Sequence, residues 1–281
     1  MPFLLLRPPA KLNRFLHIVG RRADGYHLLQ TAFELIDWTD ELAIENRDDG
    51  VIERRGGAIG VAAESDLVVR AARLLQPLAA TGAGCTLTLT KHIPTGAGLG
   101  GGSADAAAVL LGLNRLWRLD LSVERLLQLG LQLGADVPVF IGQHPAFAQG
   151  VGEVLSPVPF AARSYAVIYP AVALATGPMF ADPRLRRDCP PISVADYLAG
   201  APTGNVFEPV ALSRSVEIAA AADWLRARLG EAHLTGSGSA VFAQAAELQA
   251  AQAALAGAPA HWTCRAARSI TNWFDNDQAR A

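Results

Sequence analysis

The chain has 281 residues, which suggests about two domains and a sizeable core. Its 24 basic residues nearly balance 26 acidic ones without a long basic run, so neither a nucleic acid nor a membrane is the expected partner. Cys85, Cys189 and Cys264 are few and far apart, which predicts no disulfide framework or metal cluster and favours a cytoplasmic protein. The first apolar run is too short for a signal peptide, and no run is long enough to span a bilayer.

The first part of the chain alternates with period two. Residues 10–19 predict a strand with Leu12, Leu16 and Ile18 on one face and Lys11 and Asn13 on the other. Residues 33–38 and 41–44 predict further strands, and residues 65–66 predict the start of a helix through residues 68–75. Strict alternation over residues 86–90 predicts an antiparallel strand with one solvated face.

A glycine loop follows that strand. Five of the nine residues from Pro94 to Gly102 are glycine, and a Leu-rich stretch with helical spacing comes next. A loop that leads into a helix N-terminus presents free backbone N–H groups, which favour an anion and most often a phosphate. The loop lacks the Lys-Ser/Thr pair of a Walker A motif.

Two other interpretations of this loop remain open. Gly96-x-Gly98-x-x-Gly101 satisfies the dinucleotide-binding pattern, with Asp120 at about the usual distance, although the alternating strand before it argues against that fold. The glycines also fit a simple turn that caps a core helix.

The next elements lead to a predicted domain boundary. Ser122 predicts the N-cap of a helix that ends at Gly134, and strands are expected at residues 146–148 and 154–155. The sequence Ser-Pro-Val-Pro at residues 156–159 is typical of a linker, so we predict domains over residues 1–157 and 158–281.

The second half mixes strands and helices. Residues 165–170 predict a strand, residues 182–191 a loop, residues 216–229 a helix, and residues 234–242 a glycine turn that leads into a strand. The Ala/Gln-rich residues 243–260 predict an ordinary helix. Without regular βαβ alternation, the expected class is α+β.

Phosphoryl transfer needs an anion cradle, a proton acceptor and a cation. Asp136 is the candidate base, although Asp before Val-Pro is equally suited to cap a helix. Lys11 is the candidate cation, but a lysine on a strand is more often solvated. Tyr26, His27 and Phe180 are candidates to hold a flat base, although each alone is more often a packing or surface aromatic.

Other polar and glycine positions allow two interpretations each. Arg184, Arg186 and Arg187 have the charge to reach a diphosphate, but a solvated loop is the simpler interpretation. Gly236 and Gly238 fit either a tight turn or a second backbone approach to phosphate.

Several separate stretches match one family. They are Pro9-Ala10-Lys11-Leu12-Asn13, the eight residues from Gly20 to His27, Gly98-Leu-Gly-Gly-Gly-Ser-x-Asp-Ala-Ala107, Leu133 to Pro138, Ala148-x-Gly-x-Gly-Glu153, and Gly236-Ser-Gly-Ser239. Together they resemble the GHMP kinases, small-molecule kinases that use ATP. The likeness covers nearly the whole chain and thins at residues 45–64 and after Ala245.

The resemblance implies a two-domain GHMP-kinase fold with mixed, mainly antiparallel sheets and an active site in the cleft between the domains. It also implies ATP with Mg²⁺, and an alcohol acceptor that carries cytidine diphosphate, as in the non-mevalonate route to isoprenoids. By the same resemblance Asp136 is the base and Lys11 its charged partner.

The remaining site residues also follow from the resemblance. Those expected to bind ATP are Pro94, Gly96, Ala97, Gly98, Leu99, Gly100, Gly101, Gly102 and Ser103. Those expected to bind the acceptor are Asn13, Tyr26, His27, Thr176, Phe180, Gly236 and Ser237.

Some expectations stay open at this point. Ala104 stands where many relatives have a second Ser, so the metal ligands are not assigned, and a monomer and a homodimer are both compatible with the sequence. The rival functions are another GHMP kinase with a sugar or amino-alcohol acceptor, and a non-catalytic nucleotide-binding protein of the same fold. A side chain at Gly101 is predicted to enter the phosphate space without unfolding the chain.

Overall fold

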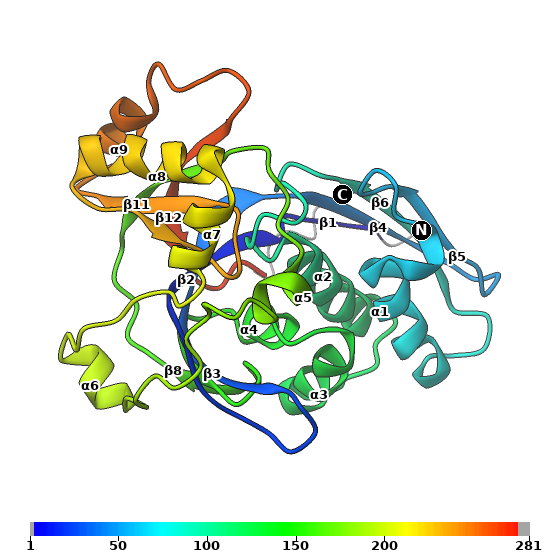
Figure 1. The fold of residues 1–281 in the computed structure, drawn as a ribbon. Helices are drawn as coiled ribbons and strands as arrows, with labels where there is room; N and C mark the ends of the chain where they lie inside the picture. Colours follow the sequence, from blue (N-terminus) through cyan, green and yellow to red (C-terminus); the bar gives the residue numbers. More distant parts are fainter. Residues whose placement is uncertain (1–2, 275–281) are drawn as a thin grey trace.

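Two sheets with helices packed against them form the part of the chain that this computed structural model describes, residues 3–274 (Figure 1). Within residues 3–274, every pair of hydrogen-bonded neighbouring strands is antiparallel except β5 with β6. This arrangement is the expected α+β class with mixed, mainly antiparallel sheets.

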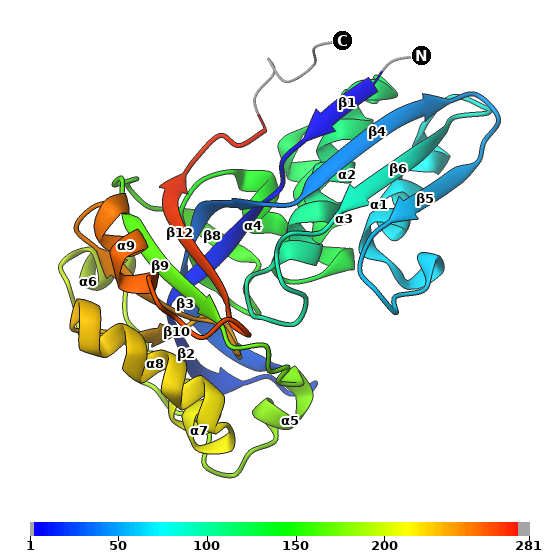
Figure 2. The same ribbon diagram turned by 90° about the horizontal axis from the view of Figure 1, so that it is seen from above.

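The four-stranded sheet contains the alternating strand that precedes the glycine loop (Figure 2). Its strand order is β1 (Phe3–Leu6), β4 (Glu41–Arg47), β6 (Gly84–Thr90) and β5 (Ile52–Gly56). Cys85, Leu87 and Leu89 are buried under the helices, whereas Thr90 is exposed. The predicted antiparallel pairing holds for β4 only, since β6 runs parallel to β5 on its other side. The predicted solvated face is only partly correct, because Thr86 on that face is 2% exposed.

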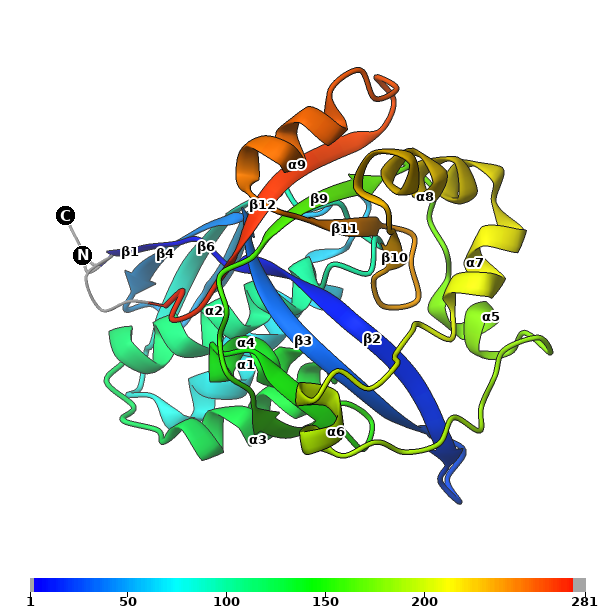
Figure 3. The same ribbon diagram turned by 90° about the vertical axis from the view of Figure 1, so that its left-hand side faces the viewer.

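The eight-stranded sheet joins the two halves of the chain (Figure 3). Its order is β10 (His233–Leu234), β11 (Val241–Ala245), β9 (Ser164–Tyr169), β12 (Thr263–Ile270), β3 (His27–Thr39), β7 (Ala146–Gln149) and β8 (Val154–Pro157), with β2 (Pro9–Arg21) paired to β3. Because β12 pairs with both β3 and β9, the sheet continues across residue 157. The boundary at that residue stays a prediction.

A bulge in β2 changes one predicted face. Asn13 pairs with Phe33, but Leu16 pairs with Thr31, so β2 contains one extra residue between Asn13 and Leu16. Leu16, and Ile18 in the same register opposite Leu29, therefore lie on the same side as Lys11 and Asn13, and not on the opposite face with Leu12. The prediction was wrong here because simple alternation does not register an inserted residue.

The helices follow the local signals in most places. Their bounds are α1 (Leu67–Leu75), α2 (Gly101–Leu116), α3 (Val123–Leu133), α4 (Val137–Gly142), α5 (Thr176–Phe180), α6 (Val194–Leu198), α7 (Glu208–Arg214), α8 (Val216–Leu229) and α9 (Leu248–Leu255), with short 3₁₀ turns η1 (Ala63–Ser65) and η2 (Gln76–Leu78). Asp66 and Ser122 cap α1 and α3, as predicted. Within residues 3–274, none of these helices is long and apolar enough to cross a membrane.

The helix predicted over residues 243–260 is wrong at both ends. Residues 241–245 form β11, and only Leu248–Leu255 form α9, which packs on β9 and β12. Alanine is small enough to be buried in a strand as well as in a helix, so composition alone did not separate the two elements.

Candidate active site

A cavity of about 840 Å³ opens between the two halves of the chain. Its walls come from β2, from the loop before α2, from the start of α4, and from the second half at α5 and the glycine turn before β11. The walls contain both Lys11 and Asp136. This position agrees with the expected active site in a cleft between two domains.

Lys11 is buried and faces a carboxylate. The residue is 2% exposed, and its Nζ lies 3.4 Å from Oδ2 of Asp136 and 2.5 Å from Oδ1 of Asn13. The ring of Phe33 lies below the ammonium group, with its centroid 5.5 Å from Nζ. The interpretation of Lys11 as a solvated strand lysine is therefore wrong.

Asp136 stands at the N-terminal end of α4, but its side chain does not act as a cap. The residue occupies the N-cap position without a hydrogen bond from its carboxylate to a backbone N–H. The side chain is 36% exposed and lines the cavity. The carboxylate is thus free to accept a hydrogen bond from a bound ligand.

A smaller cavity of about 300 Å³ adjoins the glycine loop. It is lined by all the residues predicted to bind ATP, from Pro94 to Ser103. The loop enters α2 at Gly101, and the N–H groups of a first helical turn have no intrahelical acceptor. The loop and the helix therefore fit a bound phosphate, with Ser103 lining both cavities.

Glycines in this loop serve different purposes. A Cβ on Gly96 would meet nothing within 4 Å, so Gly96 leaves open space beside the cavity. A Cβ on Gly98 would overlap the carbonyl oxygen of Thr235, so Gly98 permits the second glycine turn to pack on the loop. A Cβ on Gly101 would lie 3.0 Å from Ile93 Cγ2 and 3.2 Å from Lys91 Nζ, two residues that also line this cavity, so the effect of a side chain there on phosphate binding stays a prediction.

The second glycine turn is held in place by two residues that the sequence did not single out, Thr235 and Asn205. Thr235 joins the turn to the phosphate loop, since its hydroxyl donates to the carbonyl of Gly98 at 3.3 Å. Thr235 accepts a hydrogen bond from the backbone N–H of Asn13 (3.0 Å), and the amide of buried Asn205 donates to the carbonyls of Leu234 and Gly236 (2.8 Å each). Their small polar side chains carry no spacing signal, because their partners are more than 25 residues away in the chain.

Aromatic rings line the opposite end of the larger cavity. His27 stacks on Phe180 with ring centroids 4.9 Å apart and planes 22° apart, and Phe180 meets Phe207 edge to face. Burial, together with the nearby Arg21 and Arg187 guanidinium groups, lowers the pKa of His27, so the imidazole is neutral at pH 7. This end of the cavity offers flat apolar faces and a neutral hydrogen-bonding ring.

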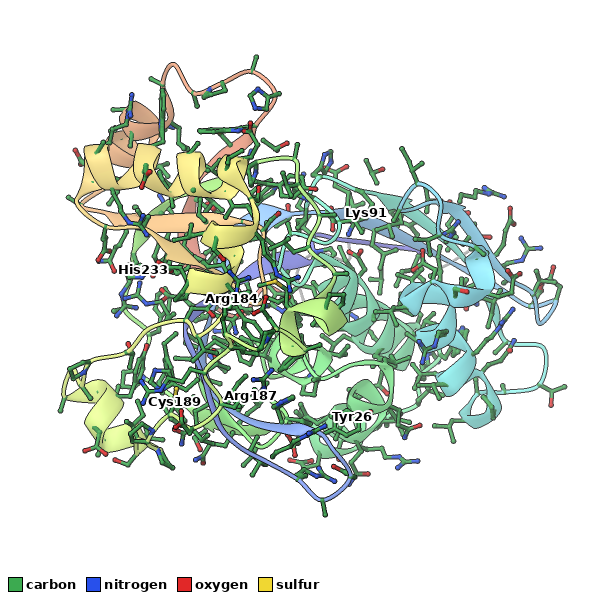
Figure 4. All side chains as sticks on the ribbon, viewed as in Figure 1. Tyr26, Lys91, Arg184, Arg187, Cys189 and His233 are labelled. Atoms are coloured by element: carbon green, nitrogen blue, oxygen red, sulfur yellow. The ribbon has the colours of Figure 1, made fainter. Side chains whose placement is uncertain are left out.

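Tyr26 lies farther out. It is 66% exposed near the tip of the β2–β3 hairpin, where Figure 4 labels it, and it still lines the cavity. Across the cavity, the hydroxyls of Thr176 and Ser237 are hydrogen-bonded to each other at 3.1 Å. The cavity therefore brings together every residue predicted to bind the acceptor.

The three arginines of the loop after α5 bond to groups nearby. Arg187 donates to the carbonyls of Phe180 (2.7 Å) and Asp182 (2.8 Å), and Arg184 donates to the Asp182 carboxylate. Figure 4 labels both arginines. Arg186 pairs with Asp188. Arg21, which was not singled out, lines the cavity instead.

A buried charge cluster lies behind the glycine loop and was also missed. Lys91 donates to the carboxylates of Asp40 and Asp105, and it is labelled beside the four-stranded sheet in Figure 4. Burial and the neighbouring Asp40 raise the pKa of Asp105 to about 8, although Lys91 opposes the change. The two carboxylates that bind Lys91 lie on separate elements of the fold, so no local sequence pattern could have revealed the cluster.

Comparisons with known proteins agree with this geometry. Residues 66–144 match the model of the GHMP kinases N terminal domain. The chain is 50% identical over 262 residues to the 4-diphosphocytidyl-2-C-methyl-D-erythritol kinase of Aromatoleum aromaticum, covering 93% of this chain and 92% of that protein. It is 52% identical over 251 residues to the enzyme of the same name from Thiobacillus denitrificans, covering 89% and 90%.

Solved structures give the same result. A crystal structure of 4-(cytidine 5'-diphospho)-2C-methyl-D-erythritol kinase superposes with a TM-score of 0.83 at 33% identity, over 95% of this chain and 99% of the other. A mevalonate kinase from Methanococcus jannaschii shares the fold, with a TM-score of 0.68 at 13% identity over 96% and 98% of the two chains.

The fold, the glycine loop and the family match define a GHMP kinase, and the chain is therefore a small-molecule kinase. Within that class, the chain belongs to the 4-diphosphocytidyl-2-C-methyl-D-erythritol kinase family. A dinucleotide-dependent oxidoreductase, a non-catalytic nucleotide-binding protein and a sugar or amino-alcohol kinase are not favoured by these relatives.

Proposed function

We propose that the protein transfers the γ-phosphoryl group of ATP to the 2-hydroxyl of 4-diphosphocytidyl-2-C-methyl-D-erythritol, giving the 2-phosphate and ADP in the non-mevalonate route to isoprenoid precursors. The observation that carries this proposal is the pair formed by buried Lys11 and half-exposed Asp136, with 3.4 Å between Nζ and Oδ2, in the wall of the cavity that the phosphate loop and the aromatic rings also line.

Asp136 and Lys11 have complementary roles in this reaction. The carboxylate of Asp136 accepts the proton of the substrate hydroxyl as its oxygen attacks the γ-phosphorus. The ammonium of Lys11, held by Asn13 on one side, offsets the negative charge that develops on the transferring group. Because Lys11 is almost fully buried, little water competes for this charge.

The two ends of the substrates have separate binding surfaces. The first turn of α2 and the residues from Pro94 to Ser103 support the ATP phosphates. We place the cytosine against Phe180 and Tyr26, with His27 as a neutral hydrogen-bonding partner, and the diphosphate near Arg21. Asn13, Thr176, Gly236 and Ser237 line the space between these two surfaces.

Mg²⁺ accompanies ATP in this proposal, and it would neutralise charge on the β- and γ-phosphates. Within residues 3–274, no three His, Cys, Asp or Glu side chains form a metal-binding group. We therefore propose that the ion is held mainly by phosphate oxygens and water, with the hydroxyl of Ser103, which lines both cavities, as a candidate ligand.

We place the protein in the cytoplasm.

A coupled assay of ADP release tests the proposed acceptor. 4-Diphosphocytidyl-2-C-methyl-D-erythritol is compared with homoserine, mevalonate and galactose at equal concentrations. We expect ADP release above the ATPase background with the first compound alone. Equal or greater release with another acceptor would contradict the proposed substrate.

A further inference from the structure

The end of the described chain returns from the second half of the fold and packs on α4. After β12 it runs toward α2 and α4 (Figure 3), where the backbone N–H of Asn272 donates to the carbonyl of Gln143 at 3.0 Å. The indole N–H of Trp273 donates to the carbonyl of Phe140 at 2.9 Å. The N–H of Phe274 donates to the side-chain carbonyl of Gln143 at 3.0 Å.

These bonds satisfy the C-terminal end of a short helix. The last carbonyls of any helix lack intrahelical partners, and here Phe140 and Gln143 obtain them from residues more than 125 positions later. Trp273 is 7% exposed and packs in the core of the first half of the chain. Water is therefore a poor substitute for its indole N–H at this buried carbonyl.

The same helix carries the candidate base. α4 contains six residues, and Asp136 stands at its N-terminal end without a capping bond of its own. The distance from Asp136 to Lys11 consequently depends on where the body of α4 lies. A displacement at the Phe140 end is transmitted to Asp136, because a helix this short moves as a unit.

Phe140 makes a second connection to the site. Its ring is fully buried, and its Cζ lies 3.0 Å from the position of the Cβ that Gly100 lacks. Lys11 Cγ lies 2.9 Å from that same position. The ring of Phe140, the stem of Lys11 and the phosphate loop therefore meet at one point, while Trp273 holds the Phe140 backbone.

We propose that the segment from Asn272 to Phe274, with Trp273 as its positioning residue, fixes the Lys11–Asp136 pair by holding the carbonyl of Phe140 and the side chain of Gln143 at the end of α4. Trp273 acts on Lys11 and Asp136 indirectly, through its bond to the Phe140 carbonyl of α4. The inference rests on the proposed role of Asp136 and adds a residue at the far end of the chain to that site.

The first test replaces Trp273 by Phe, which retains an aromatic ring and removes the donor. Trp224→Phe is the matched control, because its indole N–H also donates to a backbone carbonyl at 2.9 Å, that of Ala254, within the second half of the chain. We expect kcat for Trp273→Phe to fall about 3- to 10-fold with KM for ATP unchanged, and kcat for Trp224→Phe to stay at the wild-type value. An unchanged kcat for folded Trp273→Phe would overturn the proposal.

Gln143→Asn provides a second route if Trp273→Phe does not fold. Gln143 has a left-handed backbone (φ 60°), which Asn tolerates well, and the shorter side chain loses its bond from Phe274. We expect a smaller fall in kcat with KM for ATP again unchanged. A folded Gln143→Asn protein with wild-type kcat would overturn the proposal.

A double-mutant cycle then separates positioning from a general loss of stability. In an Asp136→Asn background, Trp273→Phe should reduce the remaining rate by less than twofold, because the carboxylate that it positions is already absent. An equal fold reduction in both backgrounds would overturn the proposal. Wild-type activity of Asp136→Asn alone would instead contradict the proposed function, and comparison of the single Trp variants would still reveal any dependence of kcat on Trp273.

Discussion

Asp136→Asn separates catalysis from folding, because Asn keeps the side-chain shape without the charge. Asp136 caps no backbone N–H, so the loss is confined to its interaction with Lys11 at 3.4 Å. Opposite charges at that distance attract by about 1 kcal/mol in water and about 5 kcal/mol at an effective dielectric constant of 20. Since 36% of the Asp136 side chain is exposed, we expect the free energy of unfolding to fall near the lower end, by about 1–2 kcal/mol.

The effect on catalysis should be larger. General-base help contributes about 10²–10⁴ in rate, and the loose transition state of phosphoryl transfer favours the lower part of that range. We expect kcat to fall about 10²–10³-fold with KM for ATP nearly unchanged, which corresponds to about 2.7–4 kcal/mol in the barrier.

Steady-state ADP release at saturating acceptor, well below the unfolding midpoint of each variant, measures this loss. Asp223→Asn is the control, since it removes an exposed charge from α8. A folded Asp136→Asn enzyme that turns over at the wild-type rate would refute the assignment of Asp136 as the base.

Three further predictions concern the other parts of the site. Gly102→Val should fold, since a Cβ there meets only Leu67 at 3.9 Å, and its side chain should raise the Kd for ATP, measured by calorimetry, at least about tenfold. An unchanged Kd would contradict the assignment of this loop as the phosphate-binding loop. Phe180→Ala or Tyr26→Ala should weaken acceptor binding by about 1–3 kcal/mol and leave ATP binding unchanged, whereas equal losses for both ligands would mean that these rings support the fold. The pKa of Asp105 is raised to about 8 in the folded protein from about 4 in the unfolded chain, so its contribution to stability declines as pH rises from 4 to 8. Asp105→Asn should therefore gain stability relative to wild type between pH 5 and pH 8 in urea unfolding, and a difference independent of pH would contradict the raised pKa.

The sequence predicted the features that depend on neighbouring residues. Glycines followed by helical Leu spacing predicted the phosphate loop and α2, and Asp66 and Ser122 marked helix starts because a cap acts within three residues. The strict alternation before the loop predicted the strand β6 and its antiparallel partner β4, since side-chain period reports on the faces of a strand, but it did not reveal the parallel partner β5.

Features set by distant contacts were beyond local patterns. The bulge in β2 moves Leu16 to the cavity side, and the burial of Lys11 depends on α4 and the phosphate loop. Lys91 was unremarkable in sequence because Asp40 and Asp105 approach it from separate elements. No local sequence pattern marks Trp273, whose role depends on its contact with the Phe140 carbonyl of α4. Tertiary packing decides each of these, so they required the structure.

The ³¹P NMR spectrum of the reaction product tests the central proposal most directly. With ATP, Mg²⁺ and 4-diphosphocytidyl-2-C-methyl-D-erythritol, we predict one new resonance, from a phosphomonoester at the 2-hydroxyl. The amount of this phosphomonoester should equal the amount of ADP formed, and the resonances of the cytidine diphosphate group should be retained. ADP formed without that phosphomonoester, or a phosphate attached at another hydroxyl, would contradict the proposed function.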